Sequence, residues 1–275
     1  MQKMLKDITI GQHFPGNSPV HNLDPRLKIL LTVAFVIVLF MSTNFVGLGL
    51  AAVLTIVVFK ASGIPLQMLK KSIKPLLPLI FFTVVLNLFF IKGEGAPLID
   101  IGFIKIYMEA VLFCIVMICR IIFLICGTSL LTYTTSPIML TDGLEALMKP
   151  LNKIHFPVHE MAMMMTIALR FIPTLIEETD KIMNAQKSRG AMLDSGSFAD
   201  RIKALVPILI PLFISSLRRA EELATAMECR CYHGGEGRTR LKQLKITNAD
   251  IRNTVIIVAA FAVILSTRLF FTRVI

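Results

Sequence analysis

A stretch from residue 29 to residue 59 contains no charged side chain. It is too long for a single upright membrane helix, because about 20 residues rising 1.5 Å each are enough to cross a hydrocarbon core of roughly 30 Å. Polar residues at 42–44 divide the stretch in the middle. The sequence therefore predicts two membrane spans, at about 27–43 and 45–61, joined as a tight hairpin.

Three further apolar runs predict spans at about 75–91, 107–134 and 251–270, and the run 107–134 contains one charge, Arg120. The loop at 92–106 is mixed in charge. Hydrophobic residues make up 55% of the chain and charged residues 17%, a balance typical of membrane proteins. We expect an all-α polytopic membrane protein with about five transmembrane helices.

The distribution of basic residues predicts the orientation in the membrane. The net charge of +11 would suggest nucleic acid for a soluble protein, but in a membrane protein lysine and arginine gather on the cytoplasmic side. They are concentrated in the N-terminal tail, in 60–74 and in 135–250. The N-terminus and the region 135–250 are therefore expected in the cytoplasm and the C-terminus outside, with no nucleic-acid partner.

The region 135–250 differs in character from the spans on either side of it. Its segments 161–176 and 204–217 are apolar, but charged residues follow each of them, as in long amphipathic helices at a membrane boundary. Ser136 followed by Pro137 predicts the start of a shorter amphipathic helix. Three domains result: a membrane domain at 1–134, a cytoplasmic domain at 135–250 and a last span at 251–275.

The motifs of enzymes and metal sites are absent. No Gly-x-x-x-x-Gly-Lys-Ser/Thr loop occurs, so the chain itself does not bind ATP in the P-loop manner. "HEMAM" at 159–163 lacks the second histidine of a zinc protease, because Met163 occupies that position. Cys229 and Cys231 lie near His233, but no second ligand pair is close. We expect no catalytic residue, no metal and no cofactor in this chain.

Two short segments share a pattern. "NAQKSRGAM" (184–192) and "TAMECRCYH" (225–233) each contain Ala-x-x-x-Arg at the end of a segment with helical spacing. Arginine near a helix C-terminus has a simple structural explanation, since it stabilises the helix dipole by about 0.3–1 kcal/mol. It can also bind a partner, because its planar fork satisfies several acceptors at once.

Four long segments resemble one family. They are "HNLDPRLKIL" (21–30), "YTTSPIMLTDGLEALMKPL" (133–151), "PVHEMAMMMTIALRFIPTLIEETDKIMNAQKSRG" (157–190) and "PLFISSLRRAEELATAMECRCYHGGEGRTR" (211–240). The chain is similar to the transmembrane T component of energy-coupling factor transporters, especially the shared component of vitamin uptake in Gram-positive bacteria. The resemblance covers nearly the whole chain.

The resemblance implies a coupling subunit in the cell membrane. Such a subunit joins two cytoplasmic ABC ATPases, which bind ATP and Mg²⁺, to a substrate-binding S component that is interchangeable. It implies amphipathic coupling helices, two of which end in arginine motifs that dock into the two ATPases. In this chain the motifs are Ser188-Arg189-Gly190 and Cys229-Arg230-Cys231.

The second motif departs further from the family pattern, which is usually Ala-Arg-Gly. Ser188 is a mild change, but Cys231 stands where glycine would adopt the left-handed conformation at little cost. Arg120 has two interpretations: a partner inside the protein, or extension of its side chain to the interface. The methionines of 161–165 fit either a core or an adaptable docking surface. A stand-alone permease or channel is the alternative function, although few polar residues line the spans.

Overall fold

The computed structural model describes residues 13–42, 44–91, 99–101, 104–191, 198–234 and 244–270. Two compact units form, one from residues 144–243 and the other from 13–143 together with 244–275. We call them the coupling unit and the membrane unit, after the roles that the resemblance implies. The expected N-terminal tail, the turn residue Thr43 and the last five residues lie outside the described residues. The domain boundaries expected at 134/135 and 250/251 stay a prediction, because the units are defined by internal packing and not by a membrane.

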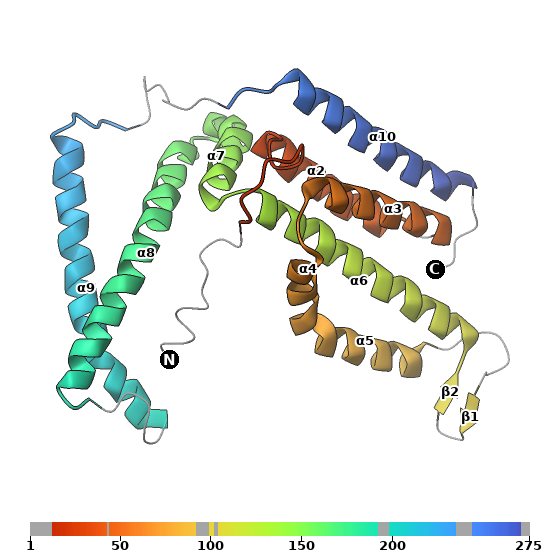
Figure 1. Ribbon diagram of the computed structural model, residues 1–275, viewed down its shortest axis with the longest axis horizontal. Helices are drawn as coiled ribbons and strands as arrows, with labels where there is room; N and C mark the ends of the chain where they lie inside the picture. The colour runs from red at the N-terminus through yellow and green to blue at the C-terminus, as the bar shows by residue number, and fades with distance from the viewer. Residues whose placement is uncertain are drawn as a thin grey trace. The chain divides into compact units, whose positions relative to one another are not determined.

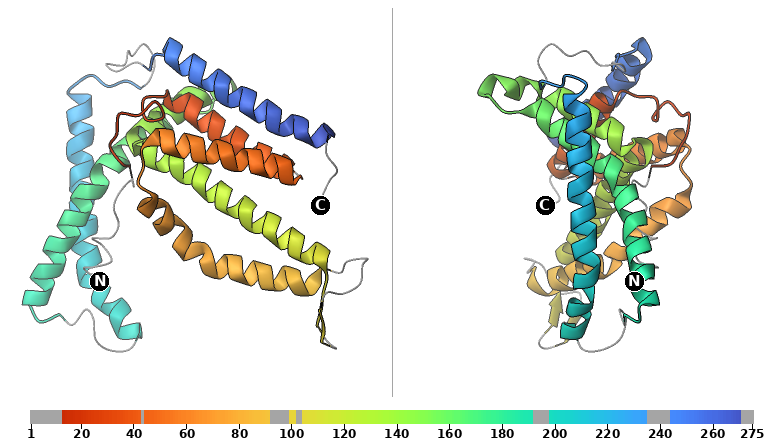
Figure 2. Two further views of the ribbon diagram at one scale, coloured as in Figure 1. Left: turned by 45° about the vertical axis from the view of Figure 1, so that its right-hand side comes forward. Right: turned by 90° about the vertical axis from the view of Figure 1, so that its left-hand side faces the viewer.

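The membrane unit is built around one long helix, α6, with α2, α3, α4 and α5 packed against it and α10 packed on α2 and α3 (Figures 1 and 2). Its helices are α2 (Pro25–Met41), α3 (Phe45–Ser62), α4 (Leu66–Ile73), the 3₁₀ helix η1 (Lys74–Leu76), α5 (Leu77–Phe90), α6 (Met108–Thr134) and α10 (Asn248–Phe270).

Among the described residues, four stretches are long and apolar enough to cross a membrane: Phe45–Ser62, Leu66–Phe90, Met108–Thr134 and Asn248–Arg268. The first expected span forms α2, which has 17 residues, at the lower limit of about 17–25 residues for a spanning helix. The third begins at Leu66, earlier than expected, because η1 joins α4 to α5. Pro75 lies in η1 and Pro78 in the first turn of α5, where the missing N–H has no intrahelical partner to lose. The all-α polytopic fold class is confirmed.

The loop expected at 92–106 contains a small antiparallel hairpin. Strand β1 (Ile99–Ile101) pairs with β2 (Ile104–Ile106), and Ile99 lies opposite Ile106. Each strand alternates isoleucine with one charged residue, which is the period of a β-strand. The signal is only three residues long on each side, too short to be separated from a loop by sequence alone.

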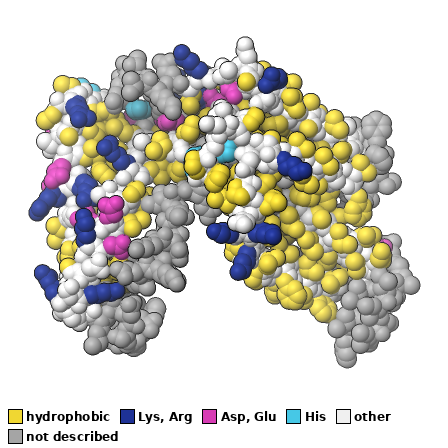
Figure 3. Space-filling view, viewed as in Figure 1, with side chains coloured by type: hydrophobic (Ala, Val, Ile, Leu, Met, Phe, Trp, Pro, Cys, Tyr) yellow, Lys and Arg dark blue, Asp and Glu magenta, His cyan; other side chains and the backbone are white. Residues whose placement is uncertain are grey.

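The core of the membrane unit lies between α2, α3, α6 and α10. Its buried members are Phe35, Val38, Leu39, Leu48, Ala51, Val116, Phe261 and Ile264. Gly127 of α6 lies directly under the ring of Phe35, where the Cβ of any other residue would collide with that ring. Hydrophobic side chains also cover much of the outside of this unit (Figure 3), with Phe81 71% and Phe90 78% exposed, as a lipid-facing surface requires.

The coupling unit consists of two long helices preceded by short ones. Helix α7 (Pro137–Met148) starts in the membrane unit, and Ser136 accepts a hydrogen bond from the backbone N–H of Met139, which confirms the predicted helix start. It is followed by the 3₁₀ helix η2 (Lys149–Ile154), α8 (Val158–Ser188) and α9 (Phe198–Glu228). Helices α8 and α9 both have 31 residues, and both contain internal proline.

Candidate functional site: two helix ends with exposed arginines

The first arginine motif ends α8 in a specific hydrogen-bonded cap. Arg189 is the C-cap residue, and Gly190 follows in the left-handed conformation with φ +86°. The N–H of Gly190 donates to the carbonyl of Lys187 at 3.0 Å, and the N–H of Ala191 donates to that of Gln186 at 3.0 Å. This pair of bonds is the Schellman motif, which satisfies carbonyls left open at a helix end.

The second motif ends α9 in the same way. The N–H of Cys231 donates to the carbonyl of Glu228 at 2.9 Å, and the N–H of Tyr232 donates to that of Met227 at 3.1 Å. Cys231 has φ +53°, so it adopts the left-handed conformation that Gly190 adopts in α8. Arg230 therefore occupies the position in its cap that Arg189 occupies in the first. Cys231 therefore forms the same cap that Gly190 forms in α8.

The six motif residues are all exposed to solvent: Ser188, Arg189, Gly190, Cys229, Arg230 and Cys231. Within the described part of the chain, no side-chain hydrogen bond or ion pair involves either guanidinium. Both arginines therefore present their full set of donors to the surroundings. Exposed guanidinium groups are compatible with binding to a partner and with stabilisation of the helix dipole, and docking stays a prediction.

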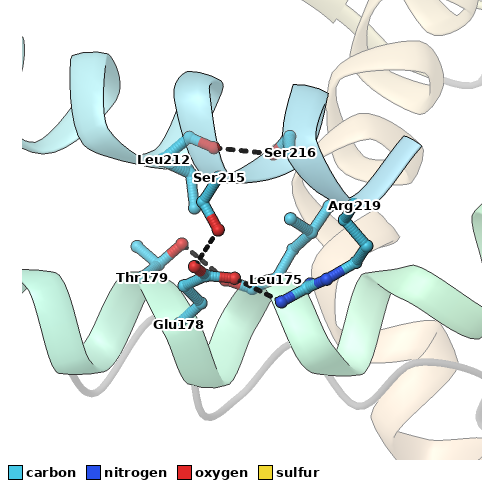
Figure 4. Close-up of polar contacts among 7 residues, drawn as sticks. All are labelled: Leu175, Glu178, Thr179, Leu212, Ser215, Ser216 and Arg219. Carbon is cyan, nitrogen blue, oxygen red and sulfur yellow. Dashed lines mark hydrogen bonds and ion pairs between the residues drawn. The ribbon is translucent and has the colours of Figure 1, made fainter. Parts of the chain in front are cut away.

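Helices α8 and α9 are joined by a polar contact in their middle (Figure 4). Arg219 donates through Nη2 to Glu178 Oε2 at 2.7 Å, and Ser215 donates its hydroxyl to the other carboxylate oxygen. The Ser215 hydrogen bond, followed by the charge of Arg219, holds the pKa of Glu178 below its ordinary value, although partial burial opposes the shift. The Arg219 guanidinium also lies 6.0 Å from the centroid of the Phe171 ring.

Apolar and polar contacts continue from this point toward the end of α8. Met183 is 1% exposed and packs against Ile208 of α9, and the side-chain amide of Gln186 donates to the carbonyl of Pro207 at 3.3 Å. Later residues of α8 thus meet earlier residues of α9, so the two helices are antiparallel. Met164 and Met165 are 61% and 42% exposed, which leaves both available for docking.

Arg120 lies in the membrane unit and is partly buried. Its Nη2 donates to the carbonyl of Ser42 at 2.9 Å, and its guanidinium lies 5.9 Å from the centroid of the Phe40 ring. Ser42 is the C-cap residue of α2, so Arg120 provides a donor at a helix end where backbone carbonyls lack intrahelical partners. This is a partner inside the protein; a role in transport stays untested.

Lys28 is a residue whose part the sequence did not reveal. In the sequence it is only one more basic residue of the N-terminal side, which predicts an exposed position, but in the structure its exposed fraction is 5%. Its ammonium donates to the carbonyls of His21 at 2.9 Å and Thr134 at 3.0 Å, and to the hydroxyl of Thr135 at 3.2 Å. Lys28 thereby caps the C-terminal end of α6 and ties it to α2 and to the segment before α2. The ion pair of Glu178 and Arg219 was also missed.

Comparison with known proteins identifies the family. Residues 16–241 match the family model CbiQ, described as a cobalt transport protein. The energy-coupling factor transporter transmembrane protein EcfT of Clostridium kluyveri is 54% identical over 247 residues, which cover 90% of this chain and 92% of that protein. The EcfT of Bacillus subtilis is 45% identical over 270 residues, which cover 98% of this chain and 100% of that protein. This chain belongs to the EcfT family. Membership in a family of transporter transmembrane proteins fits a non-catalytic membrane subunit and favours it over a stand-alone permease or channel.

Proposed function

We propose that this chain is the membrane-spanning coupling subunit of an energy-coupling factor importer. Its partners are two cytoplasmic ABC ATPases, which bind ATP and Mg²⁺, and an interchangeable substrate-binding membrane protein for vitamins or related micronutrients. One observation carries the proposal: α8 and α9 end in the same cap, each with an exposed arginine at the same position. Two equivalent helix ends suit two equivalent receptors.

The chemistry of the caps suits insertion into a protein groove. The cap bonds use carbonyls that would otherwise need water, so each helix end can be buried at lower cost. Arginine keeps its charge on burial and binds carboxylate in a bidentate manner. In this proposal ATP binding brings the ATPases together, the arginine-tipped helices move with them, and the coupling unit passes that movement to the substrate-binding protein.

The proposal includes an orientation: the N-terminus and the coupling unit in the cytoplasm, and the C-terminus outside. Its support is the lysine and arginine bias of the loops. Single cysteines in place of Lys71 and of Arg240, which lies outside the described residues, should resist an impermeant thiol reagent in intact cells. A cysteine in place of Glu94, also outside them, should react. Labelling of the cysteine at position 71 but not of the cysteine at position 94 would show that the orientation is the opposite of the proposed one.

Affinity purification tests the partnership. The tagged chain, extracted in mild detergent, should bring two ATPase chains and a small membrane protein with it, and the assembly should take up substrate only with ATP. A stand-alone permease would purify without ATPases and would transport without ATP. Protein identification in the same sample names the substrate-binding partners.

A further inference from the structure

The contact between Glu178 and Arg219 has a regular position relative to the two arginine caps. Arg219 follows Glu178 by 41 residues, and Arg230 follows Arg189 by 41 residues (219 − 178 and 230 − 189). From the ion pair to the cap arginine there are 11 residues in α8 (189 − 178) and 11 residues in α9 (230 − 219). At 1.5 Å per residue, each cap arginine lies about 16 Å along its helix from the ion pair.

The two segments between the ion pair and the caps are well suited to act as rigid arms. Neither 179–188 nor 220–229 contains proline or glycine. The internal prolines of these helices, Pro173, Pro207 and Pro211, all lie before the ion pair in the sequence. Since proline is the common cause of a sharp helix bend, bending is confined to the other halves of the helices.

The arms leave the ion pair in opposite directions, because α8 and α9 are antiparallel. In Figures 1 and 2 both helices can be followed through their crossing to their far ends. In the described part of the chain, the Met183–Ile208 packing and the Gln186–Pro207 hydrogen bond lie on the Arg189 side of the ion pair. The ion pair is therefore the anchor at the base of the α9 arm.

We propose that Glu178 and Arg219 are positioning residues that form a pivot between the two arms. The pivot keeps α8 and α9 joined where they cross, so that a movement of either docked arginine turns both arms about this contact. Ser215 completes it, since its hydroxyl and the Arg219 guanidinium hold one carboxylate oxygen each. The proposal rests on the proposed function, because it assigns the arms to ATPase docking.

The test uses the whole transporter in proteoliposomes and measures substrate taken up per ATP hydrolysed. Glu178→Gln and Arg219→Gln should keep the ATPases bound and lower that ratio by about tenfold, the scale of one charge-assisted hydrogen bond. Glu177→Gln and Arg218→Gln are matched controls, which remove the same charges from exposed neighbouring positions and should leave the ratio unchanged. The double exchange Glu178→Arg with Arg219→Glu should restore the ratio to within about twofold.

A second measurement does not depend on transport. Spin labels at Cys229 and at a cysteine replacing Ser188, with the other cysteines replaced, report the separation of the arms. In Glu178→Gln the distance distribution should broaden, and the double exchange should narrow it again. If Glu178→Gln has the wild-type ratio of substrate to ATP and an unchanged distance distribution, the proposal of a pivot is wrong. If the wild-type chain binds no ATPase, the proposed function fails, while the spin-label result still decides whether the ion pair fixes the arms.

Discussion

Cys231 and His155 are the two non-glycine residues of the described part of the chain that adopt a positive φ, and replacing Cys231 with glycine should stabilise the end of α9. Its φ of +53° is in the left-handed region, which costs a residue with a Cβ about 1–2 kcal/mol. Glycine avoids that strain, but the unfolded chain gains conformational entropy with glycine, which reduces the stabilisation by about 0.5–1 kcal/mol. The net gain from Cys231→Gly is therefore about 0.5–1 kcal/mol, a factor of roughly two to five in the opening equilibrium of the cap.

Hydrogen exchange measures this gain where it arises. The amides of residue 231 and Tyr232 donate the two cap bonds, so they should exchange about two to five times more slowly in Cys231→Gly. The equivalent change in α8, Gly190→Ala, should have the opposite sign, because Gly190 has φ +86° and alanine would adopt it under strain. Its cap amides should exchange faster by a similar factor.

Cys231→Ala is the control that separates backbone strain from thiol chemistry. Alanine has the same Cβ as cysteine, so this variant should exchange like the wild type. Faster exchange in Cys231→Gly, or slower exchange in Gly190→Ala, would refute the reasoning that left-handed strain decides the stability of these caps.

Two further predictions concern contacts inside each unit. Lys28→Met leaves two buried carbonyls without their donor, and each unsatisfied carbonyl costs about 1–3 kcal/mol of folding stability. The variant should therefore have a lower melting temperature and a lower folded yield in detergent. The control Lys60→Met, at an exposed position, should keep the wild-type values, and equal melting temperatures of the two variants would contradict the capping role. Glu178 has a pKa below its ordinary value, so its contribution is present above about pH 4.5 and is lost as the pH falls through the folded value. Among charged groups, Arg219 and Lys181 face this carboxylate. Protection of the amides around residue 178, measured as the exchange rate relative to the intrinsic rate at the same pH, should therefore fall below about pH 4.5 in the wild type and change less with pH in Glu178→Gln.

The spans and the helix ends could be predicted from the sequence because their signals are local. The uncharged run at 29–59 exceeds one membrane crossing, and the repeated Ala-x-x-x-Arg marks two helix ends. The start of α7 at Ser136 is also a local signal, given by one side chain and the proline after it. The energy that decides each of these features is provided by residues only a few positions apart.

The remaining features depend on pairs that are distant in sequence. Lys28 contacts Thr134, 106 residues away, and Glu178 contacts Arg219, 41 residues away. A lysine near a span end is typically at the interface, and a charge on an amphipathic helix is typically solvated, so the usual expectation for each residue is wrong here.

The central claim is that the two arginine caps hold the two ATPases, and copurification of the ATPases with arginine variants tests it most directly. Truncating one partner of a buried charge-assisted pair costs about 2–5 kcal/mol. Arg189→Ala and Arg230→Ala should each weaken binding of one ATPase, and the double variant should lose both while still inserting in the membrane and eluting as a single species. A double variant that retains both ATPases at the wild-type ratio and still transports would contradict the claim and leave the arginines as helix caps alone.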